Sequence, residues 1–192
     1  MGCSTQPQQQ NHPVRSLVEM RQENTVIQKW DMSCGAAALA TLLTYQHQDP
    51  ISERKIAEFM LKQTDPLRVK VRGGFSLLDL KRYVESREYY GNGYFKLTYD
   101  QLQEIGSAIV PVNLGDYNHF VIYRGTLGNK VLLADPAFGN RIVDVETFKQ
   151  SWLQGIGFVV VRKDGKPPPN KLGIMRVDFS RVPDIAVRNM LR

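Results

Sequence analysis

The sequence predicts an α+β fold in which an N-terminal helical part packs on an antiparallel sheet. Residues 34–44 are rich in Ala and Leu and have almost no polar face, which predicts a buried central helix. Ser76 and Thr98 begin segments with the spacing of a helix-capping box. From residue 108 onward, short apolar runs alternate with turn residues, which is typical of strands. Helices first and hairpin strands afterwards indicate the α+β class.

The helical part contains three predicted helices, a short strand and a fourth, shorter helix. Ser33 is expected to be the N-cap of the first helix, because a serine hydroxyl accepts hydrogen bonds from free backbone N–H groups. The second helix has an apolar stripe, and the third begins after the Gly73-Gly74 pair. In chain order the expected ranges are helices at 34–44, 52–62 and 76–85, a strand at 94–97 and a short helix from 98.

The second half is predicted to form the sheet. Gly128-Asn129 supplies a turn between two of its strands. The expected ranges are strands at 109–113, 119–124 and 130–135, a short helix at 145–152 and a strand at 157–162.

The chain divides by composition into three parts. Residues 1–24 are polar and Gln-rich and predict a flexible tether, because they offer too little apolar surface to bury. Residues 25–164 have the pattern of one globular domain. Residues 165–192 begin with the stiff spacer Lys166-Pro167-Pro168-Pro169 and continue as a tail with scattered apolar positions.

Composition excludes several functional classes. The net charge is +6, but the basic residues are scattered and no nucleic-acid-binding motif is present, so we expect no nucleic-acid partner. The sequence contains no run of 18 apolar residues, so it predicts no membrane span. The sequence has two cysteines, which do not predict a disulfide framework. Its three histidines lack the paired spacing of metal ligands, so no metal site is expected, and no motif indicates a cofactor.

Cys34 is the candidate nucleophile. It lies at the start of the apolar helix, where free N–H groups and the helix dipole both favour a thiolate. The thiolate is the reactive form of cysteine. A buried inert cysteine is the alternative for this residue considered alone.

His119 and Asp135 are the candidate base and the residue that orients it. His119 begins one predicted strand and Asp135 ends the next, so a hairpin through residues 126–129 brings their side chains together. A strand-edge histidine and an Asp-Pro turn former are the structural alternatives.

Gln28 lies six residues before Cys34, on the loop that enters the helix. Its amide N–H group is a candidate donor to the oxyanion of a tetrahedral intermediate, together with the Cys34 backbone N–H.

These motifs resemble one family. Four motifs are similar to the signatures of the bacteriocin-processing, double-glycine leader peptidases, which are family thirty-nine of the cysteine peptidases. They are Gln28 to Cys34-Gly35, His119-Phe-Val-Ile-Tyr, Asp135-Pro136 and the segment 74–80. The resemblance covers about residues 25–164. It implies a papain-like fold, Cys-His-Asp catalysis with a glutamine oxyanion donor, a peptide or protein substrate, and cleavage after Gly-Gly.

Three further expectations follow. The 192 residues show no Walker motif or membrane helix of a transporter, so we expect a stand-alone peptidase whose Gly-Gly specificity is open. A non-catalytic peptide-binding domain and an acyl transferase of similar geometry are the alternatives. Gly2-Cys3 resembles the end of a bacterial lipoprotein signal, which makes Cys3 a lipidation candidate and a membrane tether, and an ordinary disordered start is the alternative. The expected location is the periplasm-facing cell envelope, with the cytoplasm as the alternative.

Overall fold

The computed structural model describes residues 16–169 and 172–173. In chain order its elements are α1 (Leu17–Arg21), α2 (Cys34–Thr41), the π-helical turn η1 (Leu42–Gln46), α3 (Glu53–Gln63), α4 (Pro66–Arg72), α5 (Leu77–Glu85), β1 (Tyr89–Tyr94), α6 (Tyr99–Ile105), β2 (Ala108–Asn113), β3 (Asn118–Leu127), β4 (Lys130–Asp135), β5 (Gly139–Asp144), α7 (Val145–Ser151) and β6 (Gly157–Arg162).

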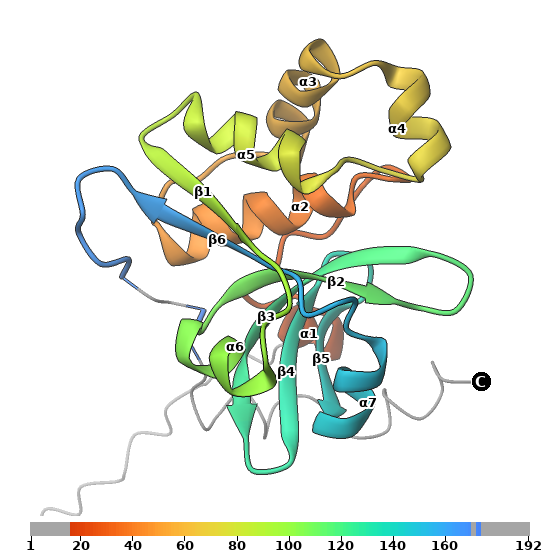
Figure 1. The fold of residues 1–192 in the computed structure, drawn as a ribbon, viewed down its shortest axis with the longest axis vertical. Helices are drawn as coiled ribbons and strands as arrows, with labels where there is room; N and C mark the ends of the chain where they lie inside the picture. The colour runs from red at the N-terminus through yellow and green to blue at the C-terminus, as the bar shows by residue number, and fades with distance from the viewer. Residues whose placement is uncertain (1–15, 170–171, 174–192) are drawn as a thin grey trace, which may run out of the picture.

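The strands form one six-stranded sheet in the order β1-β6-β2-β3-β4-β5. Every neighbouring pair is antiparallel, and β2, β3, β4 and β5 follow one another as hairpins (Figure 1). Helices α2 to α5 form the upper half of the molecule in Figure 1, against this sheet. The predicted α+β class, with a nucleophile helix packed on an antiparallel sheet, is confirmed.

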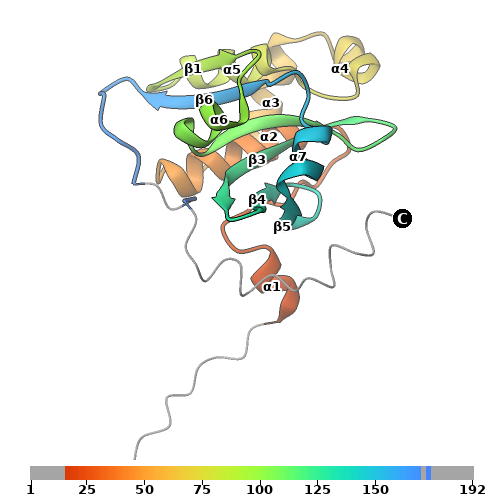
Figure 2. The same cartoon turned by 60° about the horizontal axis from the view of Figure 1, so that its bottom comes forward.

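Two apolar clusters lie on opposite faces of the sheet. The first joins α2, α3 and α5 to inward residues such as Ile109, Ile122 and Phe158. The second joins α6 and α7 to Val121, Leu133 and other residues of the opposite face. The molecule therefore has three layers, with the sheet in the middle (Figure 2).

The capping signals locate the helix starts correctly. Ser76 and Thr98 each form a complete capping box, at the starts of α5 and α6. Ser52 accepts a hydrogen bond from the Lys55 N–H and caps α3. Ser33 occupies the N-cap position of α2 as expected, but its hydroxyl makes no capping bond there.

Helix α4 and strand β5 were not predicted, and the first strand was placed wrongly. Asp65 caps α4 ahead of Pro66, and Gly73 ends it with φ of 75°, so the signals for a short helix are all present. Strand β1 runs from Tyr89 to Tyr94 and not over 94–97. Its Gly91 lies where an added β-carbon would come within 2.9 Å of Phe158 and Val84, so close packing against β6 and α5 fixes this strand.

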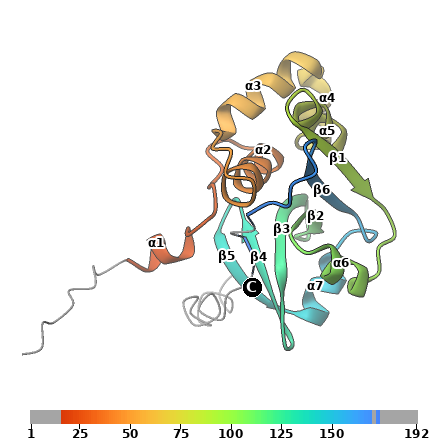
Figure 3. The ribbon, with the colours of Figure 1, turned by 90° about the vertical axis from the view of Figure 1, so that its left-hand side faces the viewer.

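The segment 16–24 contacts the edge of the sheet. A β-carbon on Gly139 of β5 would lie 2.6 Å from the Arg21 carbonyl oxygen, and the Asn140 side chain donates a hydrogen bond of 2.7 Å to the Glu23 carbonyl. Figure 3 shows α1 beside β5. Part of the segment 1–24 that was assigned to a flexible tether thus packs on the sheet, and residues 1–15, with Cys3, lie outside the described part.

The chain also returns to the core after the Pro-rich spacer. Leu172 is fully buried in the first cluster, and its carbonyl accepts a hydrogen bond of 3.0 Å from the Arg124 side chain. The segment assigned to a tail therefore contributes at least one residue to the packed domain.

We predict that Leu172→Ala destabilises the fold. Removing a fully buried leucine side chain leaves a cavity, and such changes lower the free energy of unfolding by about 2–5 kcal/mol. Urea denaturation measures the change. Leu78→Ala is the matched control, because Leu78 is 53% exposed. Equal effects of the two substitutions would contradict the packing of Leu172.

Candidate active site

Cys34 begins helix α2, and its side chain is 7% exposed. Helix α2 packs on β3 through Gly35, where an added β-carbon would lie 3.3 Å from the Phe120 ring. A glycine after the cysteine therefore lets the start of the helix approach the strand closely. This approach brings the thiol to the beginning of β3, where His119 lies.

The pKa of Cys34 is lowered although burial works against ionisation. Burial alone raises the pKa, because a buried thiolate loses its hydration. Hydrogen bonding and charge attraction from His119, with the backbone N–H groups of Phe120 and Gly35, more than offset this effect. The neighbours of Cys34 thus favour the thiolate.

His119 is buried, and its Nε2 atom lies 2.8 Å from Oδ1 of Asp135. Burial alone lowers the pKa of the ring, but hydrogen bonds to Asp135 and Cys34 and the charges of both raise it to about 9. The ring is therefore held as a cation between two groups that favour negative charge. The rings of Tyr117 and His119 lie nearly perpendicular to each other, at a centroid distance of 6.1 Å.

An irregularity in strand register places His119 and Asp135 on the same face of the sheet. The pairing of β3 with β4 shifts by one residue between Tyr123 and Gly125, so Ile122 pairs with Ala134. In this register the next residue pair is Val121 and Asp135. Val121 and His119 point to the same face of the sheet, so Asp135 points to that face as well. Without the shift, Ile122 would stand opposite Asp135, and the carboxylate would face away from the histidine. The predicted proximity is confirmed, but simple counting along the hairpin does not produce it.

Asp135 is fully buried, and both of its carboxylate oxygens are hydrogen-bonded. Oδ1 accepts from His119 and from the Ala137 N–H at 2.9 Å, while Oδ2 accepts from Nη1 of Arg141 at 2.8 Å. Burial raises the pKa of this carboxyl, but the contacts with His119 and Arg141 bring it below its usual value. The aspartate is therefore held as an anion.

Arg141 was missed by the sequence analysis. It lies on β5, directly opposite Leu133 and two residues from the Gly139 that pairs with Asp135, so it shares a face with the carboxylate. Its side chain is 14% exposed and stacks over the Phe138 ring at 5.7 Å. The only sequence signal was a basic residue six positions after Asp135, and it becomes informative once β5 is recognised.

Gln28 lies at the start of the loop that leads to Cys34. Its backbone N–H donates to the Pro136 carbonyl at 2.8 Å, so the residue after Asp135 anchors this loop to the sheet. Its side-chain Nε2 makes a long contact of 3.5 Å with the Trp30 carbonyl, and its buried Oε1 has no partner among the described residues. The amide is therefore near the helix start and only weakly held.

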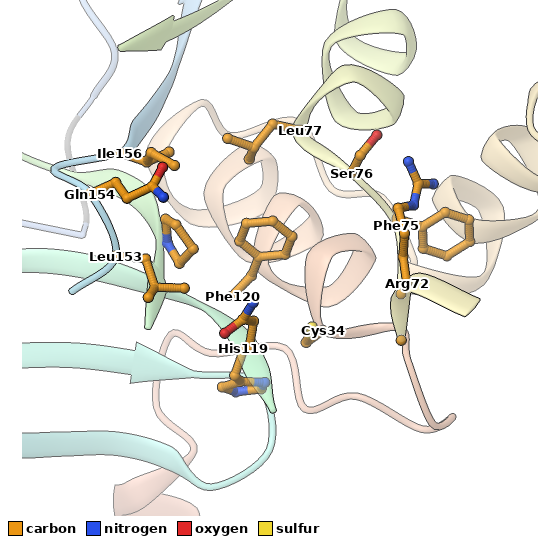
Figure 4. A pocket seen from close by; sticks show the side chains of 14 residues that line it. Cys34, Arg72, Phe75, Ser76, Leu77, His119, Phe120, Leu153, Gln154 and Ile156 are labelled. Atoms are coloured by element: carbon orange, nitrogen blue, oxygen red, sulfur yellow. The ribbon is translucent and has the colours of Figure 1, made fainter. Parts of the chain in front are cut away.

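A cleft of about 460 Å³ lies beside Cys34 and His119. Figure 4 shows Phe120, Leu77, Leu153 and Ile156 around it. Cys34 and His119 lie together at its lower end in this view. The lining is mostly apolar and includes the Gly73-Gly74 backbone. Such a lining suits a ligand with small or apolar groups.

Within the described ranges, the side chains that bind metals form no cluster suited to a metal ion. Of the helices in these ranges, none combines the length and apolar character that crossing a bilayer requires.

The chain is similar to known peptidases over most of its length. The model of the peptidase C39 family matches residues 22–164. Two proteins named probable functional amyloid protease FapD, from Pseudomonas aeruginosa and Pseudomonas fluorescens, are 40% and 38% identical to it over 149 residues. These matches cover 77% of this chain, and the chain spans 65% of the length of each relative.

Solved structures show the same fold. The peptidase domain of Streptococcus ComA, a bifunctional ABC transporter involved in quorum sensing, matches 71% of this chain and 97% of that domain, with 18% identity and a TM-score of 0.56. A double-glycine-motif protease from an AMS/PCAT transporter, crystallised with the leader peptide, matches 71% of this chain and 89% of that protein, with 24% identity and a TM-score of 0.50. The chain belongs to the peptidase C39 family of cysteine peptidases.

Proposed function

We propose that this protein is a thiol endopeptidase in which Cys34 is the nucleophile, His119 the general acid and base, and Asp135 the residue that orients His119. The observation that carries this proposal is the buried hydrogen bond of 2.8 Å between His119 and Asp135, next to a cysteine whose pKa is lowered. Nucleophile, base and orienting carboxylate form the arrangement that acyl-transfer catalysis requires.

The proposed reaction proceeds through a thioester. The Cys34 thiolate attacks the peptide carbonyl carbon, and the carbonyl oxygen takes up the negative charge. Gln28 Nε2 and the Cys34 backbone N–H donate hydrogen bonds to that oxygen. The C–N bond then breaks, and the leaving amine takes a proton from His119. Water attacks the thioester, gives a proton back to His119 and releases the acid and the thiolate.

The proposed substrate is a peptide or protein segment with small residues before the cut, with Gly-Gly as the first candidate. Phe120, packed against α2 at Gly35, lines the cleft beside the thiol, which favours residues with little side chain there (Figure 4). A relative of the same fold was crystallised with a leader peptide, and two closer relatives are named as probable functional amyloid proteases. Both peptide classes therefore belong in a substrate panel.

We predict that Cys34→Ala abolishes cleavage in a peptide library that includes Gly-Gly leaders and amyloid-subunit segments. Loss of a nucleophile typically lowers turnover by several orders of magnitude. Mass spectrometry of the products identifies the bond that is cut. Addition of amine acceptors to the same assay separates hydrolysis from acyl transfer, which would yield amide adducts. Cleavage by the variant at the parent's rate would refute the proposal, as would the absence of any product from the parent.

The thiol of Cys34 should remain reactive at pH values below the usual cysteine pKa. Because its pKa is lowered, the thiolate persists as the pH falls below ~8.5, until the pH drops below the lowered value. Asp135→Asn removes the charge that keeps His119 protonated, so the apparent pKa of the thiol should rise. The rate of iodoacetamide alkylation against pH measures both.

Asp144→Asn is the matched control for this measurement, because it is the same substitution at an aspartate whose side chain is 51% exposed. A profile centred near ~8.5 in the parent would support a domain without an activated thiol, which is the peptide-binding alternative.

We further propose that Cys3 is lipidated and tethers the protein to the cell envelope, on the strength of the Gly2-Cys3 motif. The full chain expressed in bacteria should then incorporate radiolabelled palmitate and sediment with membranes, and Cys3→Ser should do neither. Equal labelling of the two forms would rule out this site.

A further inference from the structure

Glu53 is a buried carboxyl group that contacts a single loop. It is the first residue of α3, and its side chain is 3% exposed. Both of its carboxyl oxygens accept from the Lys29 N–H, at 3.1 and 3.2 Å, and Oε1 also contacts the Ser33 hydroxyl. The loop from Gln28 to Ser33 therefore rests on Glu53.

Glu53 is not explained by packing. Among the described residues no lysine, arginine or histidine forms an ion pair with it, so its burial is offset only by the loop contacts and the start of α3. A buried carboxyl group that lacks a cation usually costs stability compared with an apolar side chain of similar size. Its presence therefore points to a task at the loop that it holds.

The loop itself is strained and needs support. Met32 has φ of 65°, a left-handed conformation that a non-glycine residue rarely adopts and that surrounding contacts must maintain. The Ser33 hydroxyl lies 2.6 Å from the Trp30 carbonyl and in contact with Glu53, so these two acceptors share its single hydrogen. Loss of Glu53 removes the contact that ties this strained turn to α3.

The two ends of this loop carry the proposed oxyanion donors. Gln28 provides its side-chain amide at one end, and the Cys34 backbone N–H follows Ser33 at the other. The Gln28 amide has only the long 3.5 Å contact with the Trp30 carbonyl, so the shape of the loop determines where it lies. An oxyanion site works only when its donors are held in advance at the position of the developing charge.

We propose that Glu53 is a positioning residue, which holds the loop 28–33 so that Gln28 and Cys34 direct their N–H groups to the oxyanion. This inference rests on the proposed function of Cys34 and Gln28. The substitution Glu53→Gln distinguishes positioning from an effect of charge. Replacing the carboxyl by an amide removes a group that can carry negative charge, which on charge grounds alone would favour an anion nearby. A positioning role requires the opposite result.

Two reagents separate oxyanion binding from thiol reactivity. A peptide aldehyde ending in Gly-glycinal adds the Cys34 thiol across its C=O bond: sulfur bonds to carbon, and the oxygen, placed at the oxyanion site, takes the proton. With iodoacetamide the sulfur bonds to a CH2 carbon and iodide leaves. The reacting carbon is not a carbonyl carbon, so no oxyanion forms. Damage to the oxyanion site therefore weakens the aldehyde complex and spares alkylation.

We expect Glu53→Gln to weaken aldehyde binding by about tenfold or more, because the amide places an NH2 donor where a carboxyl oxygen accepts from the Lys29 N–H. For comparison, deleting an oxyanion donor outright costs about 10²–10³-fold in catalysis. The iodoacetamide rate of Glu53→Gln should stay within about twofold of the parent's. Ser33→Ala, which removes one of the two contacts, should show a smaller loss in the same direction, and it decides the matter if Glu53→Gln does not fold. Glu58→Gln, the same change at an exposed residue of α3, should alter neither.

The possible results are distinct. Aldehyde binding by Glu53→Gln equal to or tighter than the parent's would overturn the positioning role alone. A parallel loss of aldehyde binding, alkylation and thermal stability would show a general structural role and would overturn it as well. A parent that neither binds the aldehyde nor is alkylated at Cys34 would overturn the proposed function and this inference together.

Discussion

The hydrogen bond between His119 and Asp135 depends on one extra residue in β3. Arg124 is the residue left over when the pairing of β3 with β4 shifts, and it is buried. Its guanidinium group donates to the Leu172 carbonyl at 3.0 Å and to the Asn140 side chain at 3.0 Å. A β-bulge is thus held by a segment that follows the Pro-rich spacer and by the edge strand β5. Because a register error of one residue moves a side chain to the other face, these distant contacts support the geometry of the candidate triad.

Burial and charge act in opposition throughout the site. Desolvation alone would neutralise Cys34, His119 and Asp135, and in each case the neighbour of opposite charge prevails. The order from β5 to α2 is Arg141, Asp135, His119 and Cys34, so positive and negative groups alternate. A buried carboxylate with only His119 as partner would be poorly compensated. Arg141 and the Ala137 N–H complete the hydrogen bonds of the carboxylate, so Asp135 remains an anion beside the His119 ring.

Local signals in the sequence were sufficient for much of the fold, and they pointed to four candidate residues, of which the structure brings Cys34, His119 and Asp135 together. The capping boxes at Ser76 and Thr98 and the apolar run from Cys34 are short-range features, which a sequence pattern reports directly. Strand β1 is different, because Tyr89–Tyr94 contains Gly91, Asn92 and Gly93, which disfavour a strand unless β6 provides a partner. Arg141, Glu53 and the bulge at Arg124 depend on pairing and packing between distant segments, which no local pattern describes.

The loop before Cys34 is the place where the helical half and the sheet meet. The Gln28 N–H donates to the Pro136 carbonyl, so within the dipeptide Asp135-Pro136 the aspartate side chain bonds to His119 and the proline carbonyl holds the loop that leads to Cys34. On the other side, Glu53 ties the same loop to α3. The sheet alone brings His119 to Asp135, and the helical half alone places Cys34 at a helix start. Only their docking sets the thiol and the imidazole in one cleft, and the close approach of Gly35 to Phe120 is the contact that permits it.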